Sequence, residues 1–268
     1  MKRLIVLGTG AGNVIRCYNT CFAIYNGEQY FLVDAGGGNQ ILSILEQKNI
    51  EIDKIKNIFV THAHTDHVLG IIWMIRIITY KMLHEQYHGN LKIYAHAELI
   101  EKIKAICNLL LPAKFLNLFD NRIMFIEIQD GEQKQILGMD FIFFDTYSTK
   151  EKQFGFVINM EGRKVLFTGD EPIKKVNVEK YLNDVDWFLS ETFCRYEDRE
   201  IYKPYEKKHS TVKEPSQLAE EYDVKNLVLW HTEDKNIKNR KKLYTEEAQR
   251  YFKGKVYVPD DLEEIDLC

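Results

Sequence analysis

The chain has 268 residues, 45% of them hydrophobic and 28% charged, which is enough apolar material to bury a sizeable core. Its formal net charge of -4 excludes a surface coated in positive charge for nonspecific nucleic-acid binding, although it permits a local basic patch. The 15 glycines and five prolines are scattered and no stretch resembles a linker or a repeat, so we expect a single domain over residues 1–268.

Cysteine usage and hydropathy indicate the compartment. Five cysteines, an odd number at irregular spacing, are not typical of a disulfide framework. The apolar run at 4–7 is too short for a signal peptide, and we interpret it as a first strand. The run at 69–83 is too short to span a bilayer and contains Arg76. We therefore expect a cytoplasmic protein with no membrane segment.

Strand patterns dominate the first part of the chain, and helical periodicity follows between and after them. The second and third strands are separated by Gly27 and Glu28, which predicts a hairpin. The predicted strands are 3–8, 21–26, 29–35, 57–62 and 91–96. The predicted helices are 38–49, 70–86 and 97–110.

The second half repeats this arrangement. The predicted strands are 122–128, 139–146, 154–160, 164–170, 186–191 and 226–231, and the predicted helices are 215–222 and 244–252. Pro215 suits the first turn of its helix. Two halves that each run from strands into helices predict the α/β class, as a four-layer αββα sandwich of two mixed β-sheets.

The stretch THAHTDH at 61–67 holds three histidines and an aspartate directly after an apolar strand. If the chain stays extended there, His62 and His64 point the same way. The following helix would carry Asp66 and His67 to a second point, so one short loop can supply ligands to two metal ions. Imidazole and carboxylate ligands suit zinc, and equally manganese or iron. The alternative, a polar loop of solvated histidines, is disfavoured by their density.

This H-x-H-x-D-H run resembles the signature of the metallo-β-lactamase-fold hydrolases. The resemblance extends over nearly the whole chain, because LGTGAG at 7–12 resembles the opening strand and turn of that family. The next motif, FLVDAGGG, would use Asp34 to support the histidine loop. LFTGD resembles the strand that delivers a metal-bridging carboxylate, Asp170, and LVLWH resembles the late strand that ends in a ligand histidine, His231.

The resemblance implies two divalent metal ions, with zinc favoured and manganese or iron as alternatives. It implies the αββα sandwich described above, known as the metallo-β-lactamase fold. One ion would be held by His62 and His64, and Asp170 would lie between the two ions. The ligands of the other ion would be Asp66, His67 and His231.

One expected ligand is absent. The family usually supplies another histidine to complete the site that holds His62 and His64, yet this chain has none between His96 and His209. The corresponding segment, 143–158, contains Asp145 and Tyr147. Tyr147 matches better in position, but a carboxylate is the easier ligand, because a tyrosine oxygen binds well only when the metal lowers its pKa. Ligation by Asp145, ligation by Tyr147 and no replacement ligand remain three alternatives.

The segment 207–231 resembles the phosphodiesterase branch of the family, particularly the tRNA 3′-processing ribonucleases. In that branch a His-Ser-Thr segment precedes a helix, and its histidine assists departure of the leaving oxygen. By matching position the resemblance assigns His209 as the general acid, a role that suits imidazole because its ordinary pKa lies near neutrality. Glu191 would orient it, and Asp66 is assigned a catalytic role beside its role as a ligand.

The alternative for His209 is a solvated residue ahead of a helix, with Thr211 and Glu214 as a capping box. Two basic stretches, 202–213 and 234–242, flank His209 and the last ligand strand, and they predict a positively charged rim for an anionic substrate. A run of Lys and Arg can equally be an ordinary solvated surface.

These features predict a metal-dependent hydrolase, with a phosphodiesterase using a metal-bound hydroxide favoured over a thioester or lactone hydrolase. The span 154–170 leaves no room for the substrate-gripping arm of many tRNA nucleases. We therefore favour a phosphodiester or other small anionic substrate over a tRNA 3′-processing endonuclease, and nucleic acid is not favoured. A non-catalytic relative is a further alternative if the missing histidine has cost the first metal. The helix at 71–87 is apolar on more than one face, which favours core burial and leaves a homodimer contact open.

Overall fold

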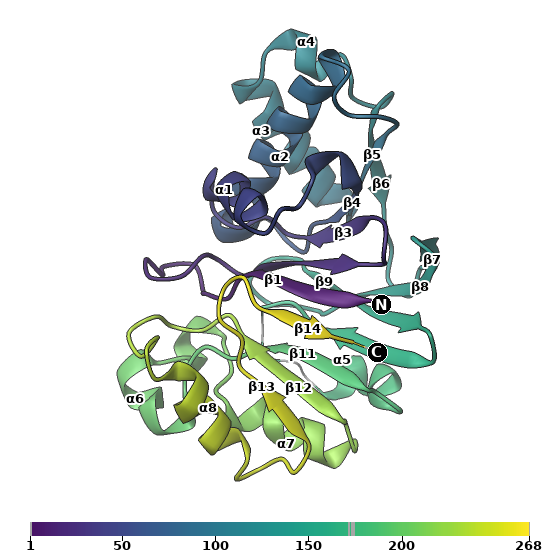
Figure 1. Cartoon of the computed structure of the whole chain (residues 1–268). Helices are drawn as coiled ribbons and strands as arrows, with labels where there is room; N and C mark the ends of the chain where they lie inside the picture. Colours follow the sequence, from purple (N-terminus) through teal and green to yellow (C-terminus); the bar gives the residue numbers. More distant parts are fainter. Residues whose placement is uncertain (1, 171, 173–174, 268) are drawn as a thin grey trace.

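The computed structural model describes residues 2–170, 172 and 175–267 (Figure 1). The first sheet contains β1 (Arg3–Gly8), β2 (Cys21–Tyr25), β3 (Tyr30–Val33), β4 (Ile55–Phe59), β5 (Leu91–Ala95), β6 (Ile123–Glu127) and β14 (Glu264–Asp266). The second sheet contains β7 (Gln133–Ile136), β8 (Met139–Asp145), β9 (Phe154–Met160), β10 (Arg163–Phe167), β11 (Trp187–Glu191), β12 (Asn226–Trp230) and β13 (Lys255–Tyr257).

The helices are α1 (Gln40–Gln47), α2 (Thr65–Leu83), α3 (Ala97–Leu110), α4 (Ala113–Leu116), α5 (Lys175–Leu182), α6 (Arg199–Tyr202), α7 (Lys213–Glu221) and α8 (Arg240–Ala248). In Figure 1, α1 to α4 gather at one end of the molecule and α6 to α8 at the other, with the strands between them. Within the described residues, no helix combines the length and the apolar character needed to cross a membrane.

Both sheets are mixed and have the same design. The spatial orders are β14-β1-β2-β3-β4-β5-β6 and β13-β12-β11-β10-β9-β8-β7. Strands β3 to β6 are parallel to one another, as are β10 to β13, whereas the strands on the other side of each sheet are antiparallel. The pairing of β14 with β1 brings the two ends of the chain together (Figure 1).

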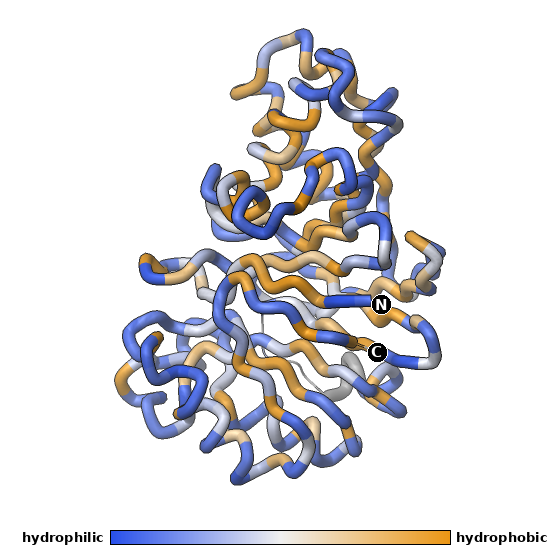
Figure 2. The backbone as a smooth tube through the Cα atoms, in the orientation of Figure 1, coloured by the Kyte–Doolittle hydropathy of each residue, from blue (hydrophilic) through white to orange (hydrophobic). Residues whose placement is uncertain are grey.

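Alternation along the strands creates three apolar layers. In β1, Leu4 and Val6 belong to the layer between the two sheets, whereas Ile5 and Leu7 belong to the layer under α1 to α4. Successive side chains of a strand point to opposite faces, so a strand buried on both faces is apolar throughout. A third layer lies between the second sheet and its helices. Figure 2 shows the corresponding hydrophobic stretches along the strands, and the predicted αββα sandwich is confirmed.

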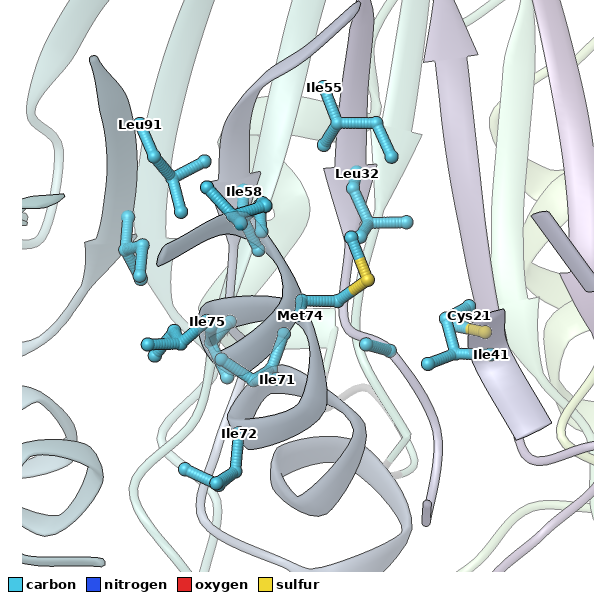
Figure 3. Packing of buried hydrophobic residues seen from close by; sticks show 14 of the residues in the cluster. Cys21, Leu32, Ile41, Ile55, Ile58, Ile71, Ile72, Met74, Ile75 and Leu91 are labelled. Carbon is cyan, nitrogen blue, oxygen red and sulfur yellow. The ribbon is translucent and has the colours of Figure 1, made fainter. Parts of the chain in front are cut away.

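Helix α2 fixes the position of the histidine loop that precedes it. Its buried face carries Ile71, Met74 and Ile75, which pack toward Leu32 and Ile58 on the strands of the first sheet (Figure 3). The expected core burial of this helix is therefore confirmed. Its opposite side leaves Trp73, Tyr80 and Leu83 partly exposed.

The predicted strands and helices are present, with three kinds of difference. Helices α4, α5 and α6, of four to eight residues, were not predicted, and α8 begins four residues before the predicted start at residue 244. Helix α2 begins at Thr65, several residues earlier than expected, so Asp66 and His67 lie in its first turn. Strands β7, β13 and β14 were not predicted, because each has only three or four residues, with little apolar character, at a sheet edge. The carboxyl ends of β4, β10 and β12 meet beside the layer between the sheets, where the predicted ligands lie.

Candidate metal centre

The six main predicted ligands come together as two groups. The ligand atoms of Asp66, His67, Asp170 and His231 all lie within 4.8 Å of one another, and so do those of His62, His64 and Asp170. Asp170 belongs to both groups, as a bridging carboxylate would.

Local geometry explains the division of the histidine loop. After β4 the chain remains extended as far as His64, whose φ and ψ of -68° and 151° precede the first turn of α2. The rings of His62 and His64 therefore meet, with Nε2 of the former 2.9 Å from Nδ1 of the latter. Asp66 and His67 lie in the helical first turn instead, so they point to the second group. An acidic residue is also favoured there by the helix dipole.

Asp34 supports this loop from the end of β3, as expected. Its carboxylate accepts hydrogen bonds from the Thr61 backbone N–H at 2.9 Å and from the Thr61 hydroxyl at 2.8 Å. The same carboxylate lies 2.7 Å from His67 Nδ1, which leaves Nε2 facing the second group. Asp34 has a φ of 53°, a left-handed conformation that aspartate tolerates better than most residues.

Asp34→Asn should therefore destabilise the protein. The Asn amide group would replace one carboxylate oxygen that accepts from Thr61 and His67, leaving buried donors without an acceptor, which costs about 2 kcal/mol of unfolding free energy. Urea denaturation of the metal-free protein measures this loss. Asp140→Asn on the exposed side of β8 is the matched control, and equal stability of the two variants would contradict the supporting role of Asp34.

The residues of the two groups fit a divalent cation. Among the described residues, His67 Nε2 is buried without a hydrogen-bond partner, while the carboxylates of Asp66 and Asp170 face it at 3.4 and 3.5 Å. Burial lowers the pKa of His231 to about 3 and holds the pKa of His62 well below its usual value, so both imidazoles are neutral and able to ligate. Burial alone would lower the pKa of His67, but the carboxylates around it hold that pKa well above its usual value, so a metal ion at His67 Nε2 would replace a proton. Buried carboxylates with imidazoles form a donor set typical of zinc.

The carboxylates of this centre stay ionised. Burial alone would raise the pKa of Asp170, but the surrounding histidines His62, His67 and His231 hold it well below its usual value. For Asp66 the effect of burial is likewise outweighed by His67 and His231, and its pKa is lowered. The protein thus concentrates negative charge where a cation would bind.

Of the three alternatives for the missing histidine, the structure favours the one without a replacement ligand over ligation by Tyr147 or by Asp145. Tyr147 is 55% exposed, and its hydroxyl donates to Asp130 Oδ2 at 3.1 Å. Its φ of 54° makes a tight turn after β8, in which Asp145 Oδ1 accepts the Tyr147 N–H at 2.7 Å. Asp145 belongs to neither ligand group among the described residues, and the exposed hydroxyl of Tyr147 is bonded to Asp130. The alternative without a replacement ligand agrees with this geometry.

The same segment supplies two residues that the sequence did not single out. Gln153 is only 2% exposed, and its amide contacts Asp170. Lys150 Nζ lies 3.3 Å from His209 Nε2. Both belong to a polar stretch, Ser148–Gln153, that resembles an ordinary solvated loop, and no spacing signal marks them.

His209 lies beside the centre and is not a solvated surface residue. Its side chain is 12% exposed, its ring stacks on Phe193, and its centroid is 5.4 Å from that of His231. Nδ1 faces Glu191 Oε2 at 3.4 Å. Burial raises the pKa of Glu191, which also accepts the Ser210 N–H at 2.6 Å. The expected contact between Glu191 and His209 is therefore present.

The alternative features around His209 are only partly as expected. Thr211 and Glu214 do interact at the start of α7, with the Thr211 N–H donating to Glu214 Oε2 at 2.8 Å. Of the two basic stretches, the first contributes Lys207 to the cavity described below. None of the residues of the second stretch lines this cavity, which corrects the expectation that both stretches rim it. Its Arg240 is instead buried and donates to Thr9 and Thr232.

A cavity of about 290 Å³ opens over both ligand groups. The loop 11–13 after β1 forms one wall, and Phe193 and His209 form another. Lys150 and Lys207 contribute two basic side chains to its lining. The remaining lining residues are His64, Asp66, Asp170 and His231. A polar molecule of modest size with negative charge therefore fits this cavity.

Comparison with known proteins agrees with this arrangement. Residues 2–255 match the protein family described as Anti-Pycsar protein Apyc1. A curated relative, ribonuclease Z of Archaeoglobus fulgidus, is 25% identical, and the match covers 87% of each chain. Among solved structures, the metallo-β-lactamase fold protein YhfI from Bacillus subtilis has a TM-score of 0.79 at 18% identity, with 98% of each chain covered. Zn²⁺-bound PqqB from Methylobacterium extorquens has a TM-score of 0.76 at 13% identity, with 99% and 100% covered.

Proposed function

The chain belongs to the Anti-Pycsar protein Apyc1 family and is a metal-dependent hydrolase of the metallo-β-lactamase fold, and from this premise we propose that it hydrolyses a small phosphodiester. The observation that carries the proposal is the contact of His209 with Glu191 beside the two ligand groups. A thioester expels a thiolate, which needs no such acid, whereas an alkoxide leaving from phosphorus gains much from one.

Two divalent ions, with zinc preferred, would occupy the ligand groups and would polarise a phosphoryl oxygen and lower the pKa of an attacking water. Asp170 would belong to both positions, while His62 and His64 would complete one of them. Asp66 lines the cavity as well as contributing a ligand atom, so its carboxylate can also orient the attacking water. The other position would be completed by His67 and His231.

His209 would act as the general acid. Glu191 Oε2 faces Nδ1 at 3.4 Å and would orient the ring, and Nε2 lies 3.3 Å from Lys150 Nζ, which also lines the cavity. Lys150 Nζ can only donate, so Nε2 accepts from it in this structure. With Nε2 protonated and Lys150 turned to the substrate phosphate, the ring would donate that proton to the leaving oxygen as the P–O bond breaks. Lys150 and Lys207 would balance the charge of the non-bridging oxygens.

Two features favour a small diester over a tRNA precursor. The cavity of about 290 Å³ is just below the range of roughly 300–1,000 Å³ typical of small-ligand sites. Strands β9 and β10 are joined directly by Glu161 and Gly162, both at positive φ, so no arm projects between them. A long nucleic acid would therefore lack a surface that grips it at a distance from the site.

The proposal predicts metal-dependent turnover of a simple diester. Protein stripped with a chelator should not hydrolyse bis(p-nitrophenyl) phosphate, and reconstitution with zinc or manganese should restore turnover, because the ligand groups would otherwise leave the attacking water unactivated. Release of p-nitrophenol measures the rate, and metal analysis gives the number of ions bound.

Two further substrates distinguish the alternatives. Hydrolysis of a thioester without hydrolysis of the diester would refute phosphodiester hydrolysis. Cleavage of a tRNA precursor with a kcat/KM well above that of small diesters would refute the small substrate and favour a tRNA 3′-processing endonuclease. The predicted order is the small diester first, the tRNA precursor second and the thioester last.

A further inference from the structure

Gln153 holds Asp170 through both ends of its amide group. Its Nε2 donates to Asp170 Oδ1 at 2.5 Å, and its Oε1 accepts the Asp170 backbone N–H at 3.0 Å. A backbone N–H can only donate, so the amide oxygen must face it and the NH₂ group must face the carboxylate. The two bonds fix the Asp170 side chain relative to its own backbone.

This arrangement uses one carboxylate oxygen and leaves the other for the ligand groups. The three histidines around Asp170 all approach Oδ2: His62 Nε2 at 3.5 Å, His67 Nε2 at 3.5 Å and His231 Nε2 at 3.4 Å. Oδ1 is turned away from them toward Gln153. Both groups therefore share a single oxygen atom of Asp170.

Gly169 allows the glutamine to approach this closely. It has a φ of +78°, and a Cβ atom at this position would lie 1.9 Å from Gln153 Oε1. A side chain at residue 169 would push the amide away from Asp170. The absence of a side chain at Gly169, in the turn after β10, therefore makes room for Gln153, the residue before β9.

We propose that Gln153 is a positioning residue that fixes Asp170 so that Oδ2 alone serves both ligand groups. Glutamine suits this role because it is neutral and carries a donor and an acceptor. A lysine would add a positive charge beside the cations, and a glutamate would oppose the Asp170 carboxylate. The inference concerns metal binding by this chain and does not rest on the identity of the substrate.

The inference matters most for the group that lacks the usual histidine. His62, His64 and Asp170 supply only three ligand atoms, whereas the other group supplies four. If the Asp170 side chain rotated, one oxygen could no longer serve both groups. The three-ligand group would lose the larger share of its ligand atoms. Gln153 would therefore compensate in part for the missing ligand by keeping Asp170 in place.

Gln153→Met tests the proposal, because methionine preserves the length of the side chain and removes both hydrogen bonds. Zinc binding is measured by calorimetric titration of the metal-free protein, with no substrate present. We expect the dissociation constant of the more weakly bound ion to rise by about 10- to 100-fold, the usual cost of losing a partner that orients a metal ligand. Gln133→Met, at an exposed position in β7, is the matched control and should bind zinc as the unchanged protein does.

The stability of the metal-free variants separates positioning from folding. Thermal unfolding is measured with and without zinc for the unchanged protein, Gln153→Met and the shorter Gln153→Ala. A smaller zinc-induced rise in Tm for both Gln153 variants supports the proposal. Unchanged zinc affinity in folded Gln153→Met would overturn it, even if Tm fell, because a purely structural residue affects folding and not the ions. Because substrate is absent, this outcome is independent of the phosphodiesterase assay.

Discussion

Asp170→Asn is expected to lower diester turnover by at least about a thousandfold. Asp170 is the only residue common to both ligand groups among the described part of the chain, so its substitution weakens both positions at once. Loss of charge stabilisation worth about 4 kcal/mol corresponds to roughly three powers of ten in rate. Asparagine keeps the shape of the side chain and can still accept from neighbours, so the effect reports on charge and ligation more than on packing.

The measurement is kcat/KM on bis(p-nitrophenyl) phosphate, together with the metal content of the purified protein. Asp140→Asn removes an exposed carboxylate from β8 and provides the control for a lost surface charge. We expect Asp170→Asn to retain fewer ions at equal zinc concentration. Near-normal turnover with a full metal content would show that Asp170 does not act as the shared carboxylate.

The histidine loop could be predicted because its geometry is local. An apolar strand followed by alternate histidines predicts that His62 and His64 share a direction, and the helix that follows predicts a second direction for Asp66 and His67. These relations depend on the period of strand and helix alone. Asp170 and His231 are more than 100 residues from this loop, and only the resemblance to a known family placed them beside it.

The residue that completes the group of His62 and His64 could not be predicted from its place in the sequence. Tyr147 matches the family in distance from Gly155, but its left-handed backbone turns the side chain outward to Asp130. A single residue in the αL conformation changes the direction of the chain, and the hydropathy of the sequence does not reveal this change. Gln153 was missed for a related reason, since its burial results from contact with Asp170 across the site and not from its own sequence surroundings.

The buried layers could be predicted from the pattern of apolar residues along the strands, whereas the edge strands of the sheets could not. Strands such as β1 and β12 are apolar on both faces because one face meets the other sheet and the other face meets helices. Short edge strands such as β13 bury little and therefore carry little pattern. The carboxyl ends of the central strands are what position the site, and those strands were the ones that could be predicted.

His209→Ala is expected to lower turnover of a diester with an alkoxide leaving group by about 100-fold or more. The ring lies next to His231 and faces Glu191, so its removal would take away the proposed proton donor without removing a residue of either ligand group. p-Nitrophenolate leaves without protonation, so bis(p-nitrophenyl) phosphate should be affected much less than an alkyl diester. The ratio of the two losses is therefore a more specific readout than either rate alone.

Both rates are measured on zinc-loaded protein whose metal content matches that of the unchanged chain. His88→Ala is the control, because that side chain is 80% exposed and its Nδ1 lies 3.3 Å from Asp53 Oδ2, near the start of β4. Equal losses on the two diesters would indicate that His209 binds the substrate, since a binding defect does not depend on the leaving group. No loss on the alkyl diester would remove His209 from the reaction and leave Lys150, 3.3 Å from its Nε2, as the nearest remaining proton donor at that wall of the cavity.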